Sequence, residues 1–393
     1  MKKKIENILS KILIYSLNSY LSIRPTQKFN KDDISNILIY SYNTGIGNFI
    51  MYTPAIMSIR DFFPNANFTL LHDSKTGCYV VLKDSGIFNK YIDVKRGLNI
   101  IEMIKYVLKI RKENFDMVIS EFHNTGLFII LITVFCGAKY RVGHVSSSGW
   151  IHPDKWDWIY NIPAKMEKNQ HEVERGLELA KAIGIDIKKR NIKPFIYLQE
   201  SDRDFAKRFL SSNGIEKGNI VISVQIGRKD KDEKHWSLDK YIALCDKILE
   251  FQDTKIILHG APNEYKSIEL VVSKMKNNPI IAAGKTTIKQ AAALLEKSDV
   301  LVCDDSGLMH MAVAVGTPVI AIFGPTDYTR TAPYGKEHTV IKKDFKCIPC
   351  SKMDLDPSQR MKTDQCPYDN KCINDITVDE LYNVIKKKFL KKE

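Results

Sequence analysis

The chain has 393 residues, of which 44% are hydrophobic and 27% charged, and its formal net charge is +13. This composition excludes global disorder and predicts about two domains, each able to bury its own core. The basic surplus favours an anionic partner, and nucleic acid, an acidic membrane surface and a phosphorylated substrate all fit it. Basic residues are dispersed rather than interleaved with aromatic ones along one stripe, which argues against nucleic acid.

The first residues combine cationic and apolar side chains. Lysines at 2–4 and 11 accompany apolar residues that fall mostly on one face of a helix over 5–23. This pattern predicts an amphipathic segment over 1–30, which either lies on an anionic membrane surface or docks on its own domain. No small-residue cleavage site follows it, so a secretory signal is not expected. The longest apolar run, 127–137, is too short to cross a bilayer and predicts a buried helix.

Strand and helix patterns alternate over 31–185. Strands are predicted at 36–41, 68–71 and 115–119, and helices at 49–63 and 171–183. The stretch 150–170 lacks periodicity and is expected to be irregular. Strands that alternate with helices predict βαβ units and a parallel sheet.

The same alternation resumes over 186–345, after a crossing segment at 186–200. Strands are predicted at 220–224, 255–259, 300–303 and 319–323, and helices at 237–250, 263–275, 287–297 and 308–315. A second parallel sheet is therefore expected. Residues 346–393 form a cysteine-containing tail, whose last helix begins at a capping box made by Thr377 and Glu380.

The strongest local motif is the turn between the strand at 300–303 and the helix at 308–315, which reads Asp304-Asp305-Ser306-Gly307. A helix N-terminus offers unpaired N–H groups and a partial positive charge, which suit a phosphate. Gly307 permits close backbone approach, and His310 in the first helical turn would add a donor. The alternative is a routine turn in which Asp305 or Ser306 caps the helix. Spacing alone favours neither interpretation.

A second motif, Thr44-Gly45-Ile46-Gly47-Asn48, also lies between a strand and a helix. It departs from the dinucleotide fingerprint because Ile50 occupies the third glycine position. On its own it indicates a plain βα turn, and the functional alternative places a ligand above the first domain.

A third motif is a cationic loop that follows the strand at 220–224. Its four basic residues suit a phosphate, whereas three interspersed acids favour a merely solvated loop. The basic residues are Arg228, Lys229, Lys231 and Lys234, and the acids are Asp230, Asp232 and Glu233.

The eight cysteines fall into two groups. Cys78, Cys136, Cys245 and Cys303 stand in apolar segments and are expected in the core as reduced thiols of a cytoplasmic chain. Cys347, Cys350, Cys366 and Cys372 cluster near the end. The first pair of this cluster has metal-ligand spacing and the second pair is wider. Structural zinc, an iron–sulfur cluster and unligated thiols stay open, with a structural role favoured over catalysis.

Taken together, these motifs resemble the heptosyltransferase family, glycosyltransferase family 9, which builds the lipopolysaccharide inner core. The matching segments are 45–48 with 53–55, 171–175, 234–236, 305–312 and 323–326. The resemblance implies the GT-B fold, in which two Rossmann-like domains face each other across a cleft, the N-terminal one binding the acceptor and the C-terminal one the donor. It also implies inverting transfer from ADP-heptose that needs no metal or other cofactor.

The resemblance also assigns roles by position. Lys234 would contact the donor phosphate or the transferred sugar, and Asp305 the sugar hydroxyls. Glu264 would approach the nucleotide ribose, and Thr326 would close the pocket. The residues that would line the diphosphate are Ser306, Gly307, Leu308, Met309 and His310. Those of the acceptor-side loop are Thr44, Gly45, Gly47 and Asn48.

One position departs from the family. Members proposed to use a catalytic base often carry Asp where this chain has Asn48, and an amide cannot accept a proton near neutral pH. One possibility is that Asn48 orients the acceptor while Asp305, Asp304 or another carboxylate is the base. The other is that this chain has a different acceptor or a different activity. The catalytic candidates are Asp305, Asn48 and Lys234. A helix N-terminus together with Lys234 would stabilise the leaving diphosphate without a metal ion.

The leading hypothesis is therefore a cytoplasmic transferase that acts on a nucleotide sugar and a lipid-linked glycan acceptor, with peripheral contact on the inner face of the membrane. One alternative is a GT-B enzyme that uses another donor, such as a hexose or an amino sugar. The other is a non-catalytic protein that binds a nucleotide sugar or acts as a membrane scaffold, which Asn48 keeps open.

Overall fold

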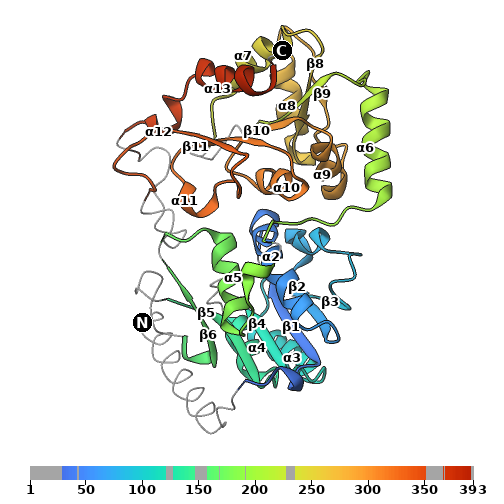
Figure 1. Ribbon diagram of the computed structural model, residues 1–393, viewed down its shortest axis with the longest axis vertical. Helices are drawn as coiled ribbons and strands as arrows, with labels where there is room; N and C mark the ends of the chain where they lie inside the picture. Colours follow the sequence, from blue (N-terminus) through green and yellow to red (C-terminus); the bar gives the residue numbers. More distant parts are fainter. Residues whose placement is uncertain are drawn as a thin grey trace. The chain divides into compact units, whose positions relative to one another are not determined.

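The computed structural model describes residues 29–41, 44–120, 127–146, 157–167, 169–190, 192–226, 235–350, 366 and 368–390. By its contacts the chain divides into two compact units, Met1–Ile192 and Lys193–Glu393 (Figure 1). The division falls within the predicted crossing segment 186–200, and the tail groups with the second unit. The predicted amphipathic helix at 5–23 and the cationic residues at 228–234 lie outside the described residues.

The first unit is built on a six-stranded parallel sheet in the order β3-β2-β1-β4-β5-β6. Its strands are β1 (Asn36–Ser41), β2 (Asn67–His72), β3 (Lys90–Asp93), β4 (Met117–Ser120), β5 (Tyr140–Ser146) and β6 (Ile162–Met166). Because β1 pairs with both β2 and β4, the strand order reverses between β1 and β4. In doubly wound sheets, ligands bind at the carboxyl ends of the strands beside such a switch point.

Helices connect and cover these strands. They are α2 (Ile46–Phe62), α3 (Ile100–Arg111), α4 (Leu127–Phe135) and α5 (Glu172–Ala182), with short 3-10 turns at η1 (Lys31–Asp33), η2 (Ser74–Thr76), η3 (Cys78–Val81), η4 (Asp157–Ile159) and η5 (Ile187–Lys189). Leu38 and Tyr40 of β1 point to one face, where they share a core with residues of α3 and α4. The apolar run at 127–137 is the buried helix that its composition predicts. No helix of the described residues has both the length and the hydropathy that crossing a bilayer requires.

Two expectations for this unit are wrong. The helix expected from 49 begins at Ile46, so the two glycines of the second motif belong to or border its first turn. The stretch 150–170, expected to be irregular, contains η4 and β6. Strand β6 lies at the sheet edge, and its second residue is Pro163. An edge strand tolerates proline and buries few side chains, so its sequence lacks the pattern of an inner strand.

The second unit repeats the same topology in the order β12-β11-β10-β7-β8-β9. Its strands are β7 (Ile220–Gln225), β8 (Thr254–His259), β9 (Ile280–Ile281), β10 (Val300–Asp304), β11 (Val319–Phe323) and β12 (Thr339–Lys342). Its helices are α6 (Glu200–Ser212), α7 (Leu238–Leu249), η6 (Pro262–Glu264), α8 (Tyr265–Val272), α9 (Ile288–Glu296), α10 (Gly307–Val315), α11 (Tyr328–Thr331), α12 (Lys371–Asn374), α13 (Val378–Ile385) and η9 (Lys386–Leu390). The four strands predicted here are confirmed. The helix expected at 263–275 consists of η6 followed by the shorter α8.

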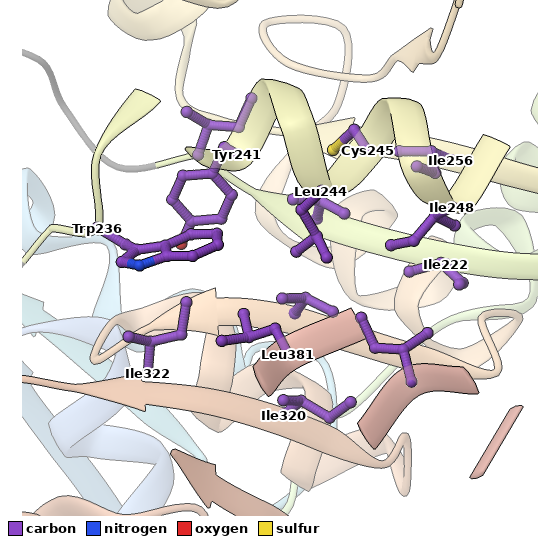
Figure 2. Packing of buried hydrophobic residues seen from close by; sticks show 14 of the residues in the cluster. Ile222, Trp236, Tyr241, Leu244, Cys245, Ile248, Ile256, Ile320, Ile322 and Leu381 are labelled. Atoms are coloured by element: carbon purple, nitrogen blue, oxygen red, sulfur yellow. The ribbon is translucent and has the colours of Figure 1, made fainter. Parts of the chain in front are cut away.

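The end of the chain completes the second core. Figure 2 shows Leu381 of α13 among side chains of α7 and of the sheet, including Trp236, Leu244 and Ile320. The Trp236 indole Nε1 donates a hydrogen bond of 2.9 Å to the Ile376 carbonyl. The capping box at the start of α13 is confirmed. Residues expected to form a separate tail therefore hold the 235–236 segment against the sheet.

Candidate active site

The second sheet brings two motifs together at its switch point. Strands β7 and β10 are neighbours, with Val302 opposite Val224, so the segments that follow them leave the same edge of the sheet. The Ser306 hydroxyl donates to the Gln225 side-chain carbonyl and ties the two strand ends together. Gln225 begins the third motif but has no role among the predicted site residues, although a polar side chain ending a buried strand at a switch point is itself a site signature.

The N-terminus of α10 supports both interpretations of its turn at once. Ser306 is the N-cap, and its hydroxyl oxygen accepts the Met309 N–H at 3.4 Å. No described residue accepts the N–H of Gly307 or Leu308. The cap therefore holds the turn in place and leaves two donors for an anion. The side chains of Met309 and His310 are buried, so only Ser306, Gly307 and Leu308 of the diphosphate-lining set present accessible surface.

Asp304 is a buried carboxylate that anchors the 235–236 segment. Its oxygens accept hydrogen bonds from His235 Nδ1 at 2.9 Å, the Tyr241 hydroxyl at 2.9 Å and the Trp236 N–H at 3.3 Å. Burial raises the pKa of the Asp304 carboxyl, and the interactions with His235 oppose that shift. Because three donors occupy this carboxylate and it is only 2% exposed, Asp304 acts as a positioning residue. The neighbouring Asp305 is half-buried.

The segment after β11 carries a buried hydroxyl that lacks a partner. Thr326 is 6% exposed, and its Oγ1 has no hydrogen-bond partner among the described residues. Burying an unpaired hydroxyl costs about 1–3 kcal/mol, so such a group is a candidate for pairing with a ligand. The backbone beside it is closely packed, since a Cβ at Gly324 would lie 3.0 Å from the Ile373 Cβ of α12.

Glu264 lies just beyond the carboxyl end of β8, at the same edge. Its Oε2 accepts the Ala261 N–H at 2.7 Å, which fixes the short turn η6. A Cβ at Gly260 would approach the Ile268 Cδ1 to 2.6 Å, so a larger residue there would require that side chain to move. Lys234, the predicted phosphate contact, lies outside the described residues, directly before the anchored His235.

In the first unit, the N-terminus of α2 lies at the switch point, after β1. Gly45 is the N-cap, without a side-chain hydrogen bond, and the first turn contains no acid. Thr44 and Gly47 are buried, whereas the Asn48 side chain is exposed. A Cβ at Gly45 would meet no atom within 4 Å, and φ there is −70°, so the backbone does not require this glycine. The turn is an open helix N-terminus suited to an anionic group.

The 171–175 motif supports that turn from behind. Arg175 and Glu172 form a buried ion pair of 2.9 Å on α5. The Arg175 carbonyl accepts from His144 Nε2 at 2.8 Å, which leaves His144 Nδ1 to accept from the Tyr52 hydroxyl at 3.2 Å. Tyr52 lies on α2, and a Cβ at Gly176 would lie 3.6 Å from its ring. This motif therefore fixes α2, the helix whose first turn is the candidate acceptor loop.

The four cysteines of the tail line one small pocket, together with Pro325 and Phe345 among others. Burial and the other three thiols raise the pKa of Cys372 to about 11. Within the described residues, no group of three His, Cys, Asp or Glu side chains is arranged to hold a metal ion. The cysteines of the apolar segments are buried and outside any disulfide among the described residues, as expected: Cys78, Cys136, Cys245 and Cys303.

Comparisons with known proteins agree with this geometry. A family model described as Glycosyltransferase family 9 (heptosyltransferase) matches residues 103–358. Lipopolysaccharide core heptosyltransferase OpsX of Haemophilus influenzae is 25% identical over 236 residues, which cover 59% of this chain and 64% of that relative.

Two solved structures are similar over 90% of the chain. A glycosyl transferase family 9 protein from Veillonella parvula is matched with a TM-score of 0.71 and 20% identity over 96% of its length. The ADP-heptose lps heptosyltransferase II of Escherichia coli is matched with a TM-score of 0.67 and 18% identity over 98% of its length. The expected fold class, GT-B with two Rossmann-like domains, is confirmed by the two sheets and by these similar structures.

Proposed function

Because the chain belongs to glycosyltransferase family 9, the heptosyltransferases, we propose that it transfers a heptose from ADP-heptose to an acceptor of the lipopolysaccharide core. The names of two similar proteins support this choice of acceptor and donor. The observation that carries the proposal is the β10–α10 turn. Two N–H groups without an acceptor among the described residues stand there, at the switch point of the second sheet.

In this proposal the second unit binds the donor. The N–H groups of Gly307 and Leu308 bind the diphosphate, since a helix N-terminus favours negative charge. The unpaired Thr326 hydroxyl donates to the bound nucleotide. Lys234 contacts the phosphate or the transferred sugar, and Glu264 approaches the ribose.

The leaving diphosphate gains charge as the bond to the sugar breaks. Donors that are fixed before the reaction stabilise such charge without reorganising. The turn is fixed in this way, because Ser306 is tied to Gln225 and the 235–236 segment is tied to Asp304. We therefore propose that transfer needs no metal ion, and the resemblance to the family implies that it inverts the configuration of the sugar.

The first unit binds the acceptor. The uncapped N-terminus of α2 suits a phosphorylated glycan, and the exposed Asn48 amide orients the attacking hydroxyl. Because Asn48 cannot accept a proton and three donors occupy Asp304, Asp305 is the proposed base. The acceptor hydroxyl then forms a bond to the anomeric carbon, its proton passes to Asp305, and ADP leaves.

A lipid-linked acceptor places the reaction at a membrane, and ADP-linked sugars are cytoplasmic metabolites. The proposed location is therefore the inner face of the cytoplasmic membrane. The net charge of +13 supports attraction to an anionic surface.

Purified protein incubated with ADP-heptose and a lipid A–Kdo acceptor should yield ADP and a heptosylated product, with turnover unchanged by EDTA. ADP-linked hexoses serve as the comparison donor. Tight binding of ADP without product from either donor would favour the non-catalytic alternative. Product from the hexose alone would favour the alternative donor.

A further inference from the structure

Helix α3 of the first unit carries an apolar ridge that its own domain does not cover. Of the seven large hydrophobic side chains that stand exposed among the described residues, four lie on this helix. They are Ile100, Ile101, Ile104 and Leu108, between 48% and 62% exposed. Their spacing places them along one side of the helix.

The adjoining side of α3 already packs in the core. Val107 and Ile110 are buried, and Met103 and Tyr106 pack against the same cluster of residues from β1, β4 and α4. The fold therefore uses one apolar face of α3, and the ridge is a second one. Contiguous exposed apolar surface of this kind marks an interaction site.

Three lysines flank the ridge. Lys105, Lys109 and Lys112 follow one another at helical spacing beside it, all three are exposed, and none forms an ion pair with a described residue. The acids nearby are engaged: Glu102 accepts the Asn99 N–H at 2.9 Å, and Glu113 pairs with Lys90 at 2.6 Å. The surface is thus apolar in the middle and cationic along one side.

We propose that this surface of α3 docks on an anionic lipid bilayer, with the four apolar side chains entering the interfacial region and the lysines contacting lipid phosphates. An apolar strip bordered by lysines is the composition of a helix that lies in a membrane surface. A second copy of the chain fits less well, because a two-fold symmetric contact would bring the lysine row of one copy close to the same lysine row of the other. Nucleic acid would leave the ridge unused.

This docking is independent of residues 1–23 and of the proposed heptose transfer, although a membrane-linked acceptor gives it a purpose. The measurement is the partition of the full chain onto vesicles of phosphatidylglycerol and phosphatidylethanolamine, with phosphatidylcholine vesicles for comparison. Wild type should bind the anionic vesicles more tightly, and added salt should weaken binding.

The ridge is tested with the triple variant Ile101→Gln, Ile104→Gln and Leu108→Gln, since glutamine keeps the helix propensity of leucine. Its partition constant should fall about 30-fold or more. The matched control is Leu270→Gln on α8, where the side chain is 48% exposed. An unchanged partition constant for the triple variant, or an equal fall for the control, overturns the proposal.

The cationic flank is tested with Lys105→Gln, Lys109→Gln and Lys112→Gln together. Each lysine near an anionic surface contributes about a five-fold factor. The control removes the same charge from three exposed lysines of the second unit: Lys266, Lys274 and Lys297. If wild type does not bind vesicles and sediments as a dimer, while the ridge variant sediments as a monomer, then the ridge contacts a second copy and the lipid proposal is wrong. Transfer to a soluble acceptor fragment, measured separately, reports on the proposed function alone.

Discussion

The two units place chemically different turns at the switch point of one topology, after the first strand in the first unit and after the fourth strand in the second. In both sheets the strand order reverses between the first and fourth strands, and a helix N-terminus follows one of them. The donor-side turn is braced: Ser306 caps α10, and Asp304 at the end of β10 holds three donors. The acceptor-side turn has no side-chain cap, and its switch-point strand β4 ends in Ser120.

Under the proposed function, this difference suits one scaffold to two ligands. A diphosphate that must be stabilised as it leaves calls for donors fixed in advance, whereas a large acceptor calls for an open surface. On the acceptor side the bracing lies behind the turn, in the packing of α5 on α2. The comparison therefore predicts that substitutions in the packing behind the α2 turn and substitutions in the bracing of the α10 turn have different consequences.

The largest effect is expected from Arg175→Met. It breaks the buried ion pair with Glu172 and should destabilise the first unit by about 3–5 kcal/mol. Urea unfolding, with hydrogen exchange in α2 and α5 to report on that unit, measures it. Lys181→Met breaks an exposed pair on the same helix and should cost about 1 kcal/mol or less. Equal effects would mean that the buried pair does not support α2.

The next largest difference between the two units is expected in how much stability each loses at low pH. In each unit, the sheet strand that comes second along the chain ends in a buried histidine: His72 in β2 and His259 in β8. Burial lowers the pKa of both, that of His259 to about 4, while Asp93 opposes the shift at His72. Ser298 donates to the Leu294 carbonyl, so Ser223 donates to Ser298 and accepts from His259 Nε2.

Since the folded pKa of His259 lies below the unfolded value of 6.5, stability is full above pH 6.5 and falls as the pH drops towards 4. The loss should reach about 3 kcal/mol. His259→Asn should flatten this acid limb, and His72→Asn should flatten it less. Unfolding curves collected between pH 4 and 7 test both variants, and an acid limb that neither variant changes would contradict the assignment.

The brace at the donor-side turn is tested by Asp304→Asn. The variant loses charge-assisted bonds to His235 and should lower stability by about 1–2 kcal/mol and weaken ADP binding. Tyr241→Phe removes one neutral donor from the same carboxylate and should cost less. ADP affinity that survives Asp304→Asn unchanged would show that the anchored segment does not position the nucleotide.

A smaller effect is expected at the open turn. Asn48→Ala should raise the acceptor KM several-fold, by loss of one or two hydrogen bonds, and leave the pH dependence of kcat unchanged. Asp305→Asn should instead remove the acidic limb of that dependence, where kcat falls as the base becomes protonated. A pH profile that changes with Asn48 and not with Asp305 would reverse the proposed roles.

The sequence predicts the second unit better than the first, for physical reasons. Its inner strands are continuous apolar runs and its helices begin at caps such as Ser237 and Thr287, so local patterns suffice. In the first unit, Gly45 and Gly47 read as loop residues although α2 starts between them. Strand β6 forms by pairing with β5 at the sheet edge, and Pro163 makes its sequence unlike that of a strand. The contacts that join Tyr52, His144 and Arg175 are long-range and have no local signature.

The central claim is that the carboxyl edge of the second sheet binds the nucleotide, and two buried hydroxyls test it directly. Thr326 and Thr254 are both 6% exposed, and the Oγ1 of each lacks a partner among the described residues. Thr326 lies beyond the carboxyl end of β11, whereas Thr254 begins β8 at the opposite edge.

Replacing either with valine removes an unpaired polar atom and should leave the free protein as stable or more stable. Calorimetric titration with ADP is the measurement. Thr326→Val should weaken ADP binding about ten-fold, by loss of one hydrogen bond to a charged ligand, and Thr254→Val should bind as wild type does. Equal ADP affinity in the two variants would contradict a nucleotide site at this edge.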